Sequence, residues 1–169
     1  MIQPIARYGQ AVLHRACAPV LDYGSDVATL IDDMFATMHA ADGVGLAANQ
    51  IGIGLRVFVY DCPDATGIRQ VGHVINPTLR IPAALAPPVS APEACLSLPG
   101  QQADLARPAH AIVTGYNRRR DPVTITGTGL LARCLQHEID HLDGIVYTDR
   151  LPAAERAAIL SAVSPDTGG

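Results

Sequence analysis

The sequence predicts an α+β fold in which antiparallel strands lie between helical segments. Helical patterns at 26–40 and 130–142 enclose a stretch in which strand-like segments follow one another, and a third helix is predicted at 152–163. Strands that are grouped between helices, rather than alternating with them, are typical of the α+β class. No repeat or linker divides the 169 residues, so we expect a single domain over residues 1–169.

The first helix is predicted from apolar residues that return to one face. Within 26–40 they occur at i, i+3, i+4, i+7, i+8 and i+11, as Val27, Leu30, Ile31, Met34, Phe35 and Met38. At this spacing we expect the two methionines to pack in the core rather than to bind a metal. The segment 43–50 that follows, GVGLAANQ, is made mostly of small and apolar residues.

The middle of the chain carries the strand signals. Residues 56–60 and 71–79 are rich in residues that favour strands. Residues 111–116 and 123–126 have the same character and predict a pair of strands joined by a short connection. Between these two groups, four prolines within 81–92 predict an extended surface loop.

The C-terminal part of the chain returns to helix. The helical pattern of 130–142 ends shortly before Gly144, a residue that suits the backbone just past a helix. A short strand is predicted at 145–147. Pro152 favours the start of a last helix over 152–163.

Composition excludes several classes of protein. With 49% hydrophobic and 17% charged residues, the chain is globular rather than disordered. A net charge of −4 and few aromatic residues argue against nucleic acid as a partner. The one basic run, 118–120, is expected at a solvated hairpin tip. The chain has no lysine, which excludes a lysine nucleophile.

Nothing in the sequence predicts a secreted or membrane protein. The first residues lack a signal pattern, and no apolar run is long enough to span a bilayer. We therefore expect a cytoplasmic protein without a membrane partner. Cysteines are reduced in that compartment, so Cys17, Cys62, Cys95 and Cys134 are candidates for packing, catalysis or metal binding rather than for disulfides.

The strongest chemical signal is the segment His137-Glu138-Ile139-Asp140-His141. Residues four apart lie on one face of a helix, so His137 and His141 can direct ring nitrogens at one cation. Glu138 lies beside a ligand and can move protons without binding the metal itself. A surface helix with two histidines at this spacing by coincidence is the alternative, and the apolar side of the helix argues against it.

A third protein ligand must come from elsewhere, because two histidines leave a tetrahedral cation incompletely bound. Downstream, Asp143, Asp149 and Glu155 are candidates, but none has an obvious ligand motif around it. Upstream, Cys95 offers a thiolate, which suits a borderline-soft divalent metal. Cys134 lies on the same helix as the histidines, and we expect it to pack rather than to bind.

Three segments together resemble the motifs of the peptide deformylase family, in the family's order. Residues 43–50 match GxGxAAxQ in every fixed position, and residues 137–144 match HExDHLxG. Residues 93–97, EACLS, resemble the family's EGCLS with Ala94 in place of glycine. The similarity extends from the first helix to about Leu151. It implies antiparallel strands packed around a central metal-binding helix, with N- and C-terminal helices.

The resemblance also assigns roles to residues of this chain. It implies a metal held by Cys95, His137 and His141. Glu138 would take a proton from water and deliver it to the departing amine. The Gln50 side-chain amide and the Leu96 backbone N–H would bind the oxyanion.

The implied reaction is metal-dependent hydrolysis of the N-formyl group from the N-terminal formylmethionine of nascent peptides, which releases formate. Gly43 and Gly45 would let the N-formyl peptide approach closely and pair with this segment as an added strand. Val44, Leu130 and Cys134 would contribute to an apolar pocket for the methionine side chain.

The resemblance implies one divalent metal ion per chain, most commonly Fe(II), with Zn or Ni able to occupy the same site. The ligand types alone would suggest zinc. Carboxylates often orient metal-bound histidines, and the candidates here are Glu93, Asp140 and Asp143, with Arg107 as a partner for one of them. Ordinary ion pairs are the alternative for these residues.

Ribosome docking is not expected. In some relatives a basic C-terminal helix docks on the ribosome, but residues 152–163 carry only Glu155 and Arg156 as charged residues. The resemblance therefore does not extend to this partner.

Ala94 keeps two other functions open. If the family's backbone has a positive φ here, alanine would cost roughly 1 kcal/mol or would shift the chain. The protein would then be a diverged relative that acts on another N-formyl compound or transfers the formyl group. A metal-binding protein without activity is the second alternative, and the presence of both Gln50 and Glu138 argues against it.

Overall fold

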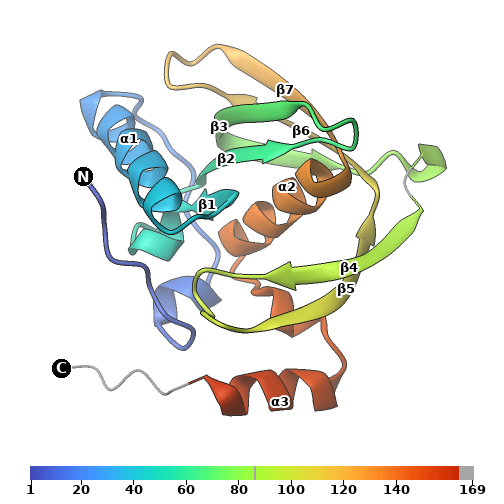
Figure 1. Cartoon of the computed structure of the whole chain (residues 1–169). Coiled ribbons are helices and arrows are strands. Elements are labelled where there is room, and N and C mark those ends of the chain that lie inside the picture. The colour runs from blue at the N-terminus through green and yellow to red at the C-terminus, as the bar shows by residue number, and fades with distance from the viewer. Residues whose placement is uncertain (86, 164–169) are drawn as a thin grey trace.

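The described residues fold into two antiparallel sheets and three α-helices (Figure 1). The structure is a computed structural model that describes residues 1–85 and 87–163. The helices are α1 (Ser25–Ala40), α2 (Gly129–Leu142) and α3 (Ala153–Ala162). The larger sheet, in the order β1-β2-β3-β6-β7, contains β1 (Gly45–Ala47), β2 (Val57–Pro63), β3 (Arg69–Arg80), β6 (His110–Tyr116) and β7 (Pro122–Thr128). The smaller sheet pairs β4 (Pro88–Ala94) with β5 (Gln102–Pro108).

Short 3-10 helices connect these elements. They are η1 (Ala11–His14), η2 (Ala48–Ile51), η3 (Ala83–Leu85) and η4 (Tyr147–Arg150). The one that matters most for function is η2, because it directly follows β1 and carries the end of the GVGLAANQ segment.

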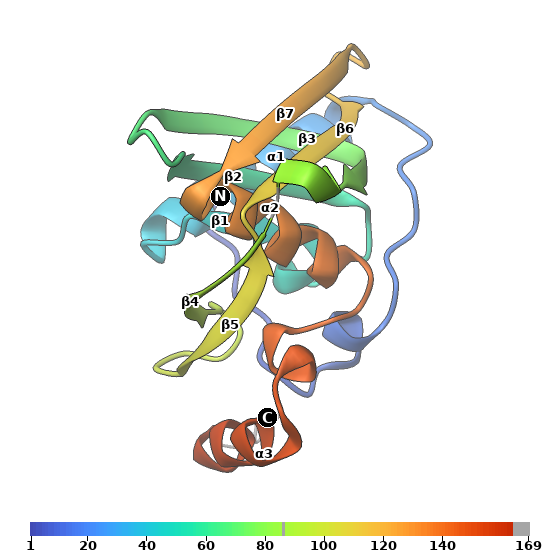
Figure 2. The same cartoon turned by 90° about the vertical axis from the view of Figure 1, so that its right-hand side faces the viewer.

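The helix α2 lies at the centre of the fold, between the larger sheet and the β4–β5 hairpin (Figures 1 and 2). Every residue from 131 to 142 is buried. On one side, Leu131, Leu135 and Leu142 pack into the core of the larger sheet. Polar groups that are buried this deeply need hydrogen-bond partners within the protein. The polar side chains of α2 therefore mark a built site rather than a solvated helix face.

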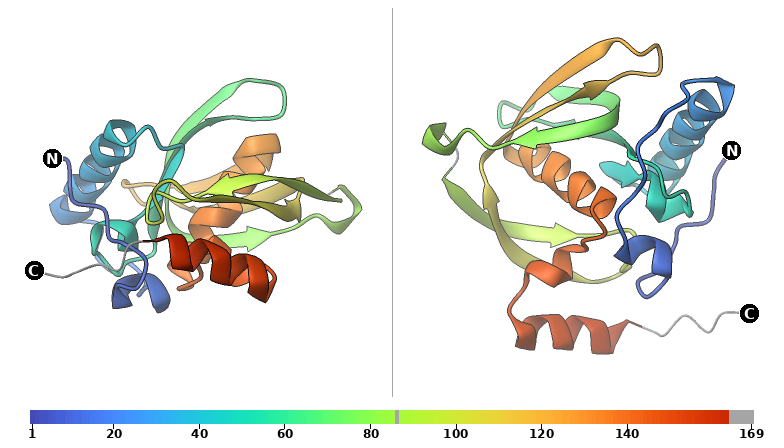
Figure 3. Two further views of the ribbon diagram at one scale, coloured as in Figure 1. Left: turned by 60° about the horizontal axis from the view of Figure 1, so that its bottom comes forward. Right: turned by 180° about the vertical axis from the view of Figure 1, so that it is seen from behind.

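The other two helices lie at the periphery. α1 packs on the larger sheet through the predicted apolar face, so Met34 and Met38 are core residues as expected. α3 lies below the β4–β5 hairpin, at the end of the molecule that also holds η1 (Figure 3, right). Its buried residue Ile159 packs with Tyr147 and Leu151. The α+β class, the central α2 and the terminal helices predicted from the sequence are confirmed.

Two local predictions are wrong. Residues 145–147 do not form a strand, because Tyr147 begins η4, where the Asp149 carboxylate accepts a hydrogen bond from the Val146 N–H at 2.9 Å. The proline-rich segment 81–92 is not a loop throughout, since residues 88–92 belong to β4. Residue 86 of that segment lies outside the described residues.

The prolines of β4 are compatible with a strand because the hairpin has no third member. β4 pairs with β5 alone, so a proline without an N–H can stand where no ladder partner is needed. Alternate residues of β4 and β5 face α2, among them Glu93, Leu105 and Arg107, which are buried. The opposite face, with Ser90, Ala94 and Ala106 among its residues, is exposed.

Within the described part of the chain, no helix has both the length and the apolar character needed to cross a membrane.

Candidate metal centre

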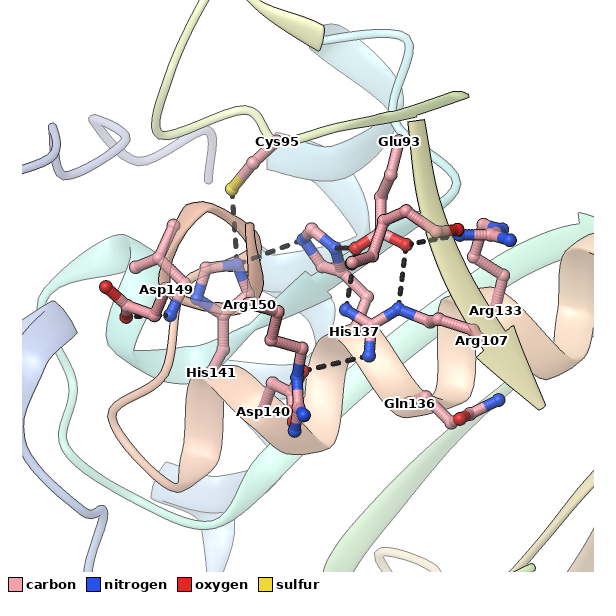
Figure 4. Close-up of polar contacts among 12 residues, drawn as sticks. Glu93, Cys95, Arg107, Arg133, Gln136, His137, Asp140, His141, Asp149 and Arg150 are labelled. Atoms are coloured by element: carbon pink, nitrogen blue, oxygen red, sulfur yellow. Dashed lines mark hydrogen bonds and ion pairs between the residues drawn. The ribbon is translucent and has the colours of Figure 1, made fainter. Parts of the chain in front are cut away.

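Two histidines on α2 and one cysteine after β4 bring three donor atoms together (Figure 4). The Nε2 atoms of His137 and His141 are 3.1 Å apart, as expected for residues separated by one helical turn. The Sγ atom of Cys95 lies 3.2 Å from Nε2 of His141. One ligand atom from each residue lies within 4.8 Å of the others, and all three side chains are buried.

These residues fit a divalent metal ion. Two imidazoles and a thiolate are the donors that Zn and Fe accept, and three protein ligands leave a position open for a reactant. Burial lowers the pKa of His141, which favours the neutral form that ligates a cation. The other candidates for the third ligand point elsewhere: Asp143 pairs with Arg56, and Asp149 accepts the Val146 N–H.

Glu138 follows His137 on α2 and lines the same cavity as His137 and Cys95. Its side chain is buried, and Oε2 has no hydrogen-bond partner within the described part of the chain. Burial raises the pKa of Glu138 to about 7. A carboxyl group with this pKa can both accept and release a proton near neutral pH. An unpartnered buried carboxylate is costly, so this atom is placed for a group that the protein itself does not supply.

The side chain of Gln50, on η2, points toward the metal ligand Cys95. Its Oε1 accepts the N–H of Ala47 at 2.9 Å, which fixes the orientation of the amide. The Nε2 donor is thereby turned toward Cys95 Sγ, at 3.6 Å, and Ser97 Oγ, at 3.3 Å. Leu96, whose N–H is the other predicted oxyanion donor, follows Cys95 and lies on the wall of the same cavity.

A cavity of about 460 Å³ opens beside the donors. Its wall includes all five residues predicted to contact a substrate, namely Gly43, Val44, Gly45, Leu130 and Cys134. It also includes Gln50, Cys95, His137 and Glu138. The predicted substrate-binding residues, Glu138 and two of the three predicted metal ligands thus line one space, and His141 lies beside those two ligands.

A sequence model of the polypeptide deformylase family matches residues 2–157. The chain belongs to this family. It is 55% identical over 150 residues to peptide deformylase 2 of Streptomyces avermitilis, which covers 89% of this chain and 80% of that protein. It is 50% identical to peptide deformylase 2 of Streptomyces coelicolor, over 96% of this chain and 90% of that protein.

Solved deformylase structures have the same fold. The peptide deformylase of Thermus thermophilus superposes with a TM-score of 0.84 at 39% identity, covering 96% of this chain and 93% of that one. The peptide deformylase of Ehrlichia chaffeensis, in complex with actinonin, superposes with a TM-score of 0.86 at 34% identity. That match covers 95% of this chain and 94% of the other.

The deformylase centre rests on a buried network of charges. Glu93 accepts hydrogen bonds from His137 Nδ1 at 2.8 Å, from Arg107 Nη2 at 2.6 Å and from Arg133 Nη1 at 3.0 Å (Figure 4). Burial alone would raise the pKa of Glu93, but the hydrogen bonds from Arg107 and His137 outweigh it and hold the pKa below its ordinary range. A charged Glu93 fixes the ring of His137 with Nε2 toward the metal position.

The other predicted carboxylates act at a greater distance. The Asp140 carboxylate accepts hydrogen bonds from Arg107 at 2.9 Å and from Arg150 at 2.6 Å rather than from a histidine ring. Arg107 therefore links Asp140 to Glu93. Asp143 pairs with Arg56 at 2.8 Å and does not orient a histidine.

Four residues that support the deformylase centre are not predicted from the sequence. Asn49 donates to the backbone carbonyl of His141 at 2.6 Å, and the Tyr147 ring stacks on His137 with centroids 6.3 Å apart. Ser97 Oγ accepts a hydrogen bond from the Gln50 amide, and Arg133 donates one to Glu93. Asn49 and Ser97 lie inside two of the motif segments, and Arg133 lies one helical turn before His137. The residue type alone does not predict that such a polar side chain will be buried.

Ala94 does not strain the backbone. Among the described residues other than glycine, positive φ occurs at Asp42, Asn76 and Arg120. Ala94 ends β4 in ordinary strand pairing with Gln102. The cost expected for alanine in place of the family's glycine is therefore absent, and Cys95 reaches the two histidines all the same.

Replacing Gly45 with alanine is expected to lower kcat/KM about 10- to 100-fold. A Cβ atom at Gly45 would overlap Oε1 of Glu138 and lie 2.7 Å from Sγ of Cys134, so the carboxylate would have to move. Displacements of about 1 Å at a reacting group cost roughly 10²-fold in rate. The matched control is Gly54→Ala, since a Cβ there meets nothing within 4 Å. Equal activities of the two variants would contradict this placement of Gly45.

Proposed function

We propose that this deformylase hydrolyses the N-formyl group from the N-terminal formylmethionine of nascent peptides and releases formate. One catalytic domain over residues 1–169 would do this in the cytoplasm. The observation that carries the proposal is that Cys95, His137 and His141 meet beside a cavity whose wall includes Glu138, and that Oε2 of Glu138 has no hydrogen-bond partner among the described residues.

We propose that Cys95, His137 and His141 hold one metal ion per chain, with Fe(II) as the resident metal and Zn or Ni as substitutes. When bound, such an ion supplies Lewis-acid activation of water at neutral pH. Metal analysis after anaerobic purification tests the choice. Iron near one equivalent per chain supports Fe(II), whereas stoichiometric zinc with full activity contradicts it.

Glu138 carries the proton in this proposal. Its pKa of about 7 lets it take a proton from the attacking water and deliver it to the departing amine. Gln50 Nε2 and the Leu96 N–H stabilise the negative charge that develops on the formyl oxygen. The hydrogen bond from the Ala47 N–H keeps the Gln50 donor aimed without any rearrangement during the reaction.

The substrate binds beside the free edge of β1. β1 pairs with β2, and its other edge lies next to the cavity, so an extended peptide can add as a strand along residues 43–45. The side chain of the formylated residue then enters the apolar part of the cavity, against Val44, Leu130 and Cys134.

We propose no nucleic-acid, membrane or ribosome partner. The net charge of −4 disfavours a phosphate-backbone surface. The charged residues of α3 are Glu155, which is exposed, and Arg156, which is half-buried and pairs with Asp149 at 2.8 Å. The helix therefore offers no basic surface for ribosomal RNA.

Formate release from formyl-Met-Ala-Ser tests the function directly. The metal-loaded protein is expected to deformylate this peptide and to leave formylated amines without a peptide backbone almost untouched. The diverged activities raised by Ala94 predict the reverse preference, or transfer of the formyl group to an added acceptor. With Ala94 in an ordinary strand, no feature of the described residues favours them.

Metal affinity is expected to rise with pH. Burial would lower the pKa of His137, but hydrogen bonds to Cys95 and Glu93 raise it well above its ordinary value in the metal-free protein. A metal ion must displace that proton, so its affinity should increase toward alkaline pH by up to about tenfold per unit for each proton released. Competition with a chelator at pH 6 and pH 8 measures this. Equal affinities at both values would contradict it.

A further inference from the structure

A second cavity, of about 280 Å³, adjoins the one that holds the deformylase centre. The two share three wall residues, Pro92, Leu130 and Arg133. Beyond them, the second cavity runs between the first turn of α2 and the inner face of the β4–β5 hairpin, where Val89 and Ala91 contribute to its wall. Nothing in the proposed reaction uses this space.

The shape of the second cavity follows from the small side chain of Ala91. Along β4, Val89, Ala91 and Glu93 alternate onto the face that looks toward α2. Glu93 reaches across and binds His137, but the methyl group of Ala91 does not fill the space next to it. A hollow is therefore left directly behind the pocket assigned to the first side chain of the substrate.

The wall of the second cavity contains two arginines, and the charge of each is compensated by carboxylates inside the protein. Arg133 lies on it, but its guanidinium donates to Glu93, to the Leu105 carbonyl and to the Val89 carbonyl. Arg107 is likewise occupied by Glu93 and Asp140. The remaining wall residues are glycine, alanine, valine, leucine and proline. Such a space accepts an apolar group and rejects a charged one.

We infer that the second cavity extends the pocket for the first substrate residue and receives the far end of an unbranched apolar side chain longer than methionine. This inference rests on the proposed function, which places that side chain against Leu130. Leu130, which is 44% exposed, and Arg133 line both spaces. An unbranched side chain that runs past Leu130 would enter the second cavity at the three wall residues that the two spaces share.

A series of formyl peptides of the form formyl-Xaa-Ala-amide tests the inference, with norleucine, 2-aminooctanoic acid and 2-aminodecanoic acid as Xaa. Burial of each added methylene favours binding by up to about fourfold. For the metal-loaded protein, kcat/KM is expected to be at least as high with 2-aminodecanoic acid as with norleucine. A steep fall along the series would overturn the inference.

Ala91→Ile fills the second cavity from β4 and is expected to lower the ratio of 2-aminodecanoic acid to norleucine activity at least about tenfold. The matched control is Ala106→Ile, the same change on the exposed face of the same hairpin, which should leave the ratio as it is. Ala91→Val serves if the isoleucine variant does not fold. Equal ratios in Ala91→Ile and the control would also overturn the inference. No formate from the norleucine peptide would instead refute the proposed function itself.

Discussion

Replacing Glu138 with glutamine should lower kcat about 10²- to 10⁴-fold while the metal content stays the same. The range is that of a lost general acid–base group. Glutamine has nearly the same shape and is not charged, so it suits a buried position in which Oε2 has no partner among the residues that the structure describes. Formate release and metal analysis on the same preparation separate the two effects.

The matched control for this variant is Glu155→Gln, the same chemical change at an exposed position of α3. It should have the activity of the unaltered protein. If Glu138→Gln retained more than about a tenth of the activity at full metal content, another group would have to carry the proton.

Replacing Cys95 with serine should weaken metal binding by at least about 100-fold and reduce activity in proportion to the metal lost. Loss of a residue that merely orients a ligand costs roughly 10- to 100-fold, so loss of a ligand should cost more. Serine is close in size to cysteine, which limits the damage to the packing of Cys95 with Leu98 and Tyr147. Titration with Zn against a chelator measures the affinity.

Cys17→Ala is the control for a general effect of removing a cysteine, because Cys17 is buried but not part of the donor group. It should retain both metal and activity. Wild-type affinity in Cys95→Ser would mean that the third protein ligand lies elsewhere.

Much of the centre was predictable because its chemistry depends on spacing within short segments. The His137–His141 pair follows from helical geometry alone, and α2 is a helix with an apolar face as the pattern indicates. Cys95 could be selected only through the resemblance, since no spacing rule links it to residues more than 40 positions away. That Cys95 lies beside His137 and His141 is shown only by the folded structure.

The β4–β5 hairpin is the largest part of the fold that the sequence does not predict, and the reason is physical. Its inner face carries Glu93 and Arg107, which lie buried because they neutralise each other and His137. A strand whose buried face is charged does not show the alternation of apolar and polar residues that predicts strands. Its prolines removed the remaining signal. Only the structure shows that Glu93 and Arg107 are buried together on the inner face of the hairpin.

The residues that support the metal centre from other segments could not be predicted from the sequence either. Asn49, which holds the His141 carbonyl, and Tyr147, which covers His137, act through contacts between segments far apart in the chain. Their residue types alone carry no information about those partners. The sequence predicts a strand at Tyr147, because Val146 and Tyr147 have strand propensity, but the turn closed by Asp149 overrides it.

X-ray absorption at the metal edge, on protein purified without oxygen, tests the shared cation most directly. One sulfur scatterer at about 2.3 Å and two imidazole nitrogens at about 2.0–2.1 Å are expected if the ion is zinc, and one sulfur with two nitrogens for any resident metal. A first shell made of nitrogen and oxygen alone, with no sulfur, would contradict the account.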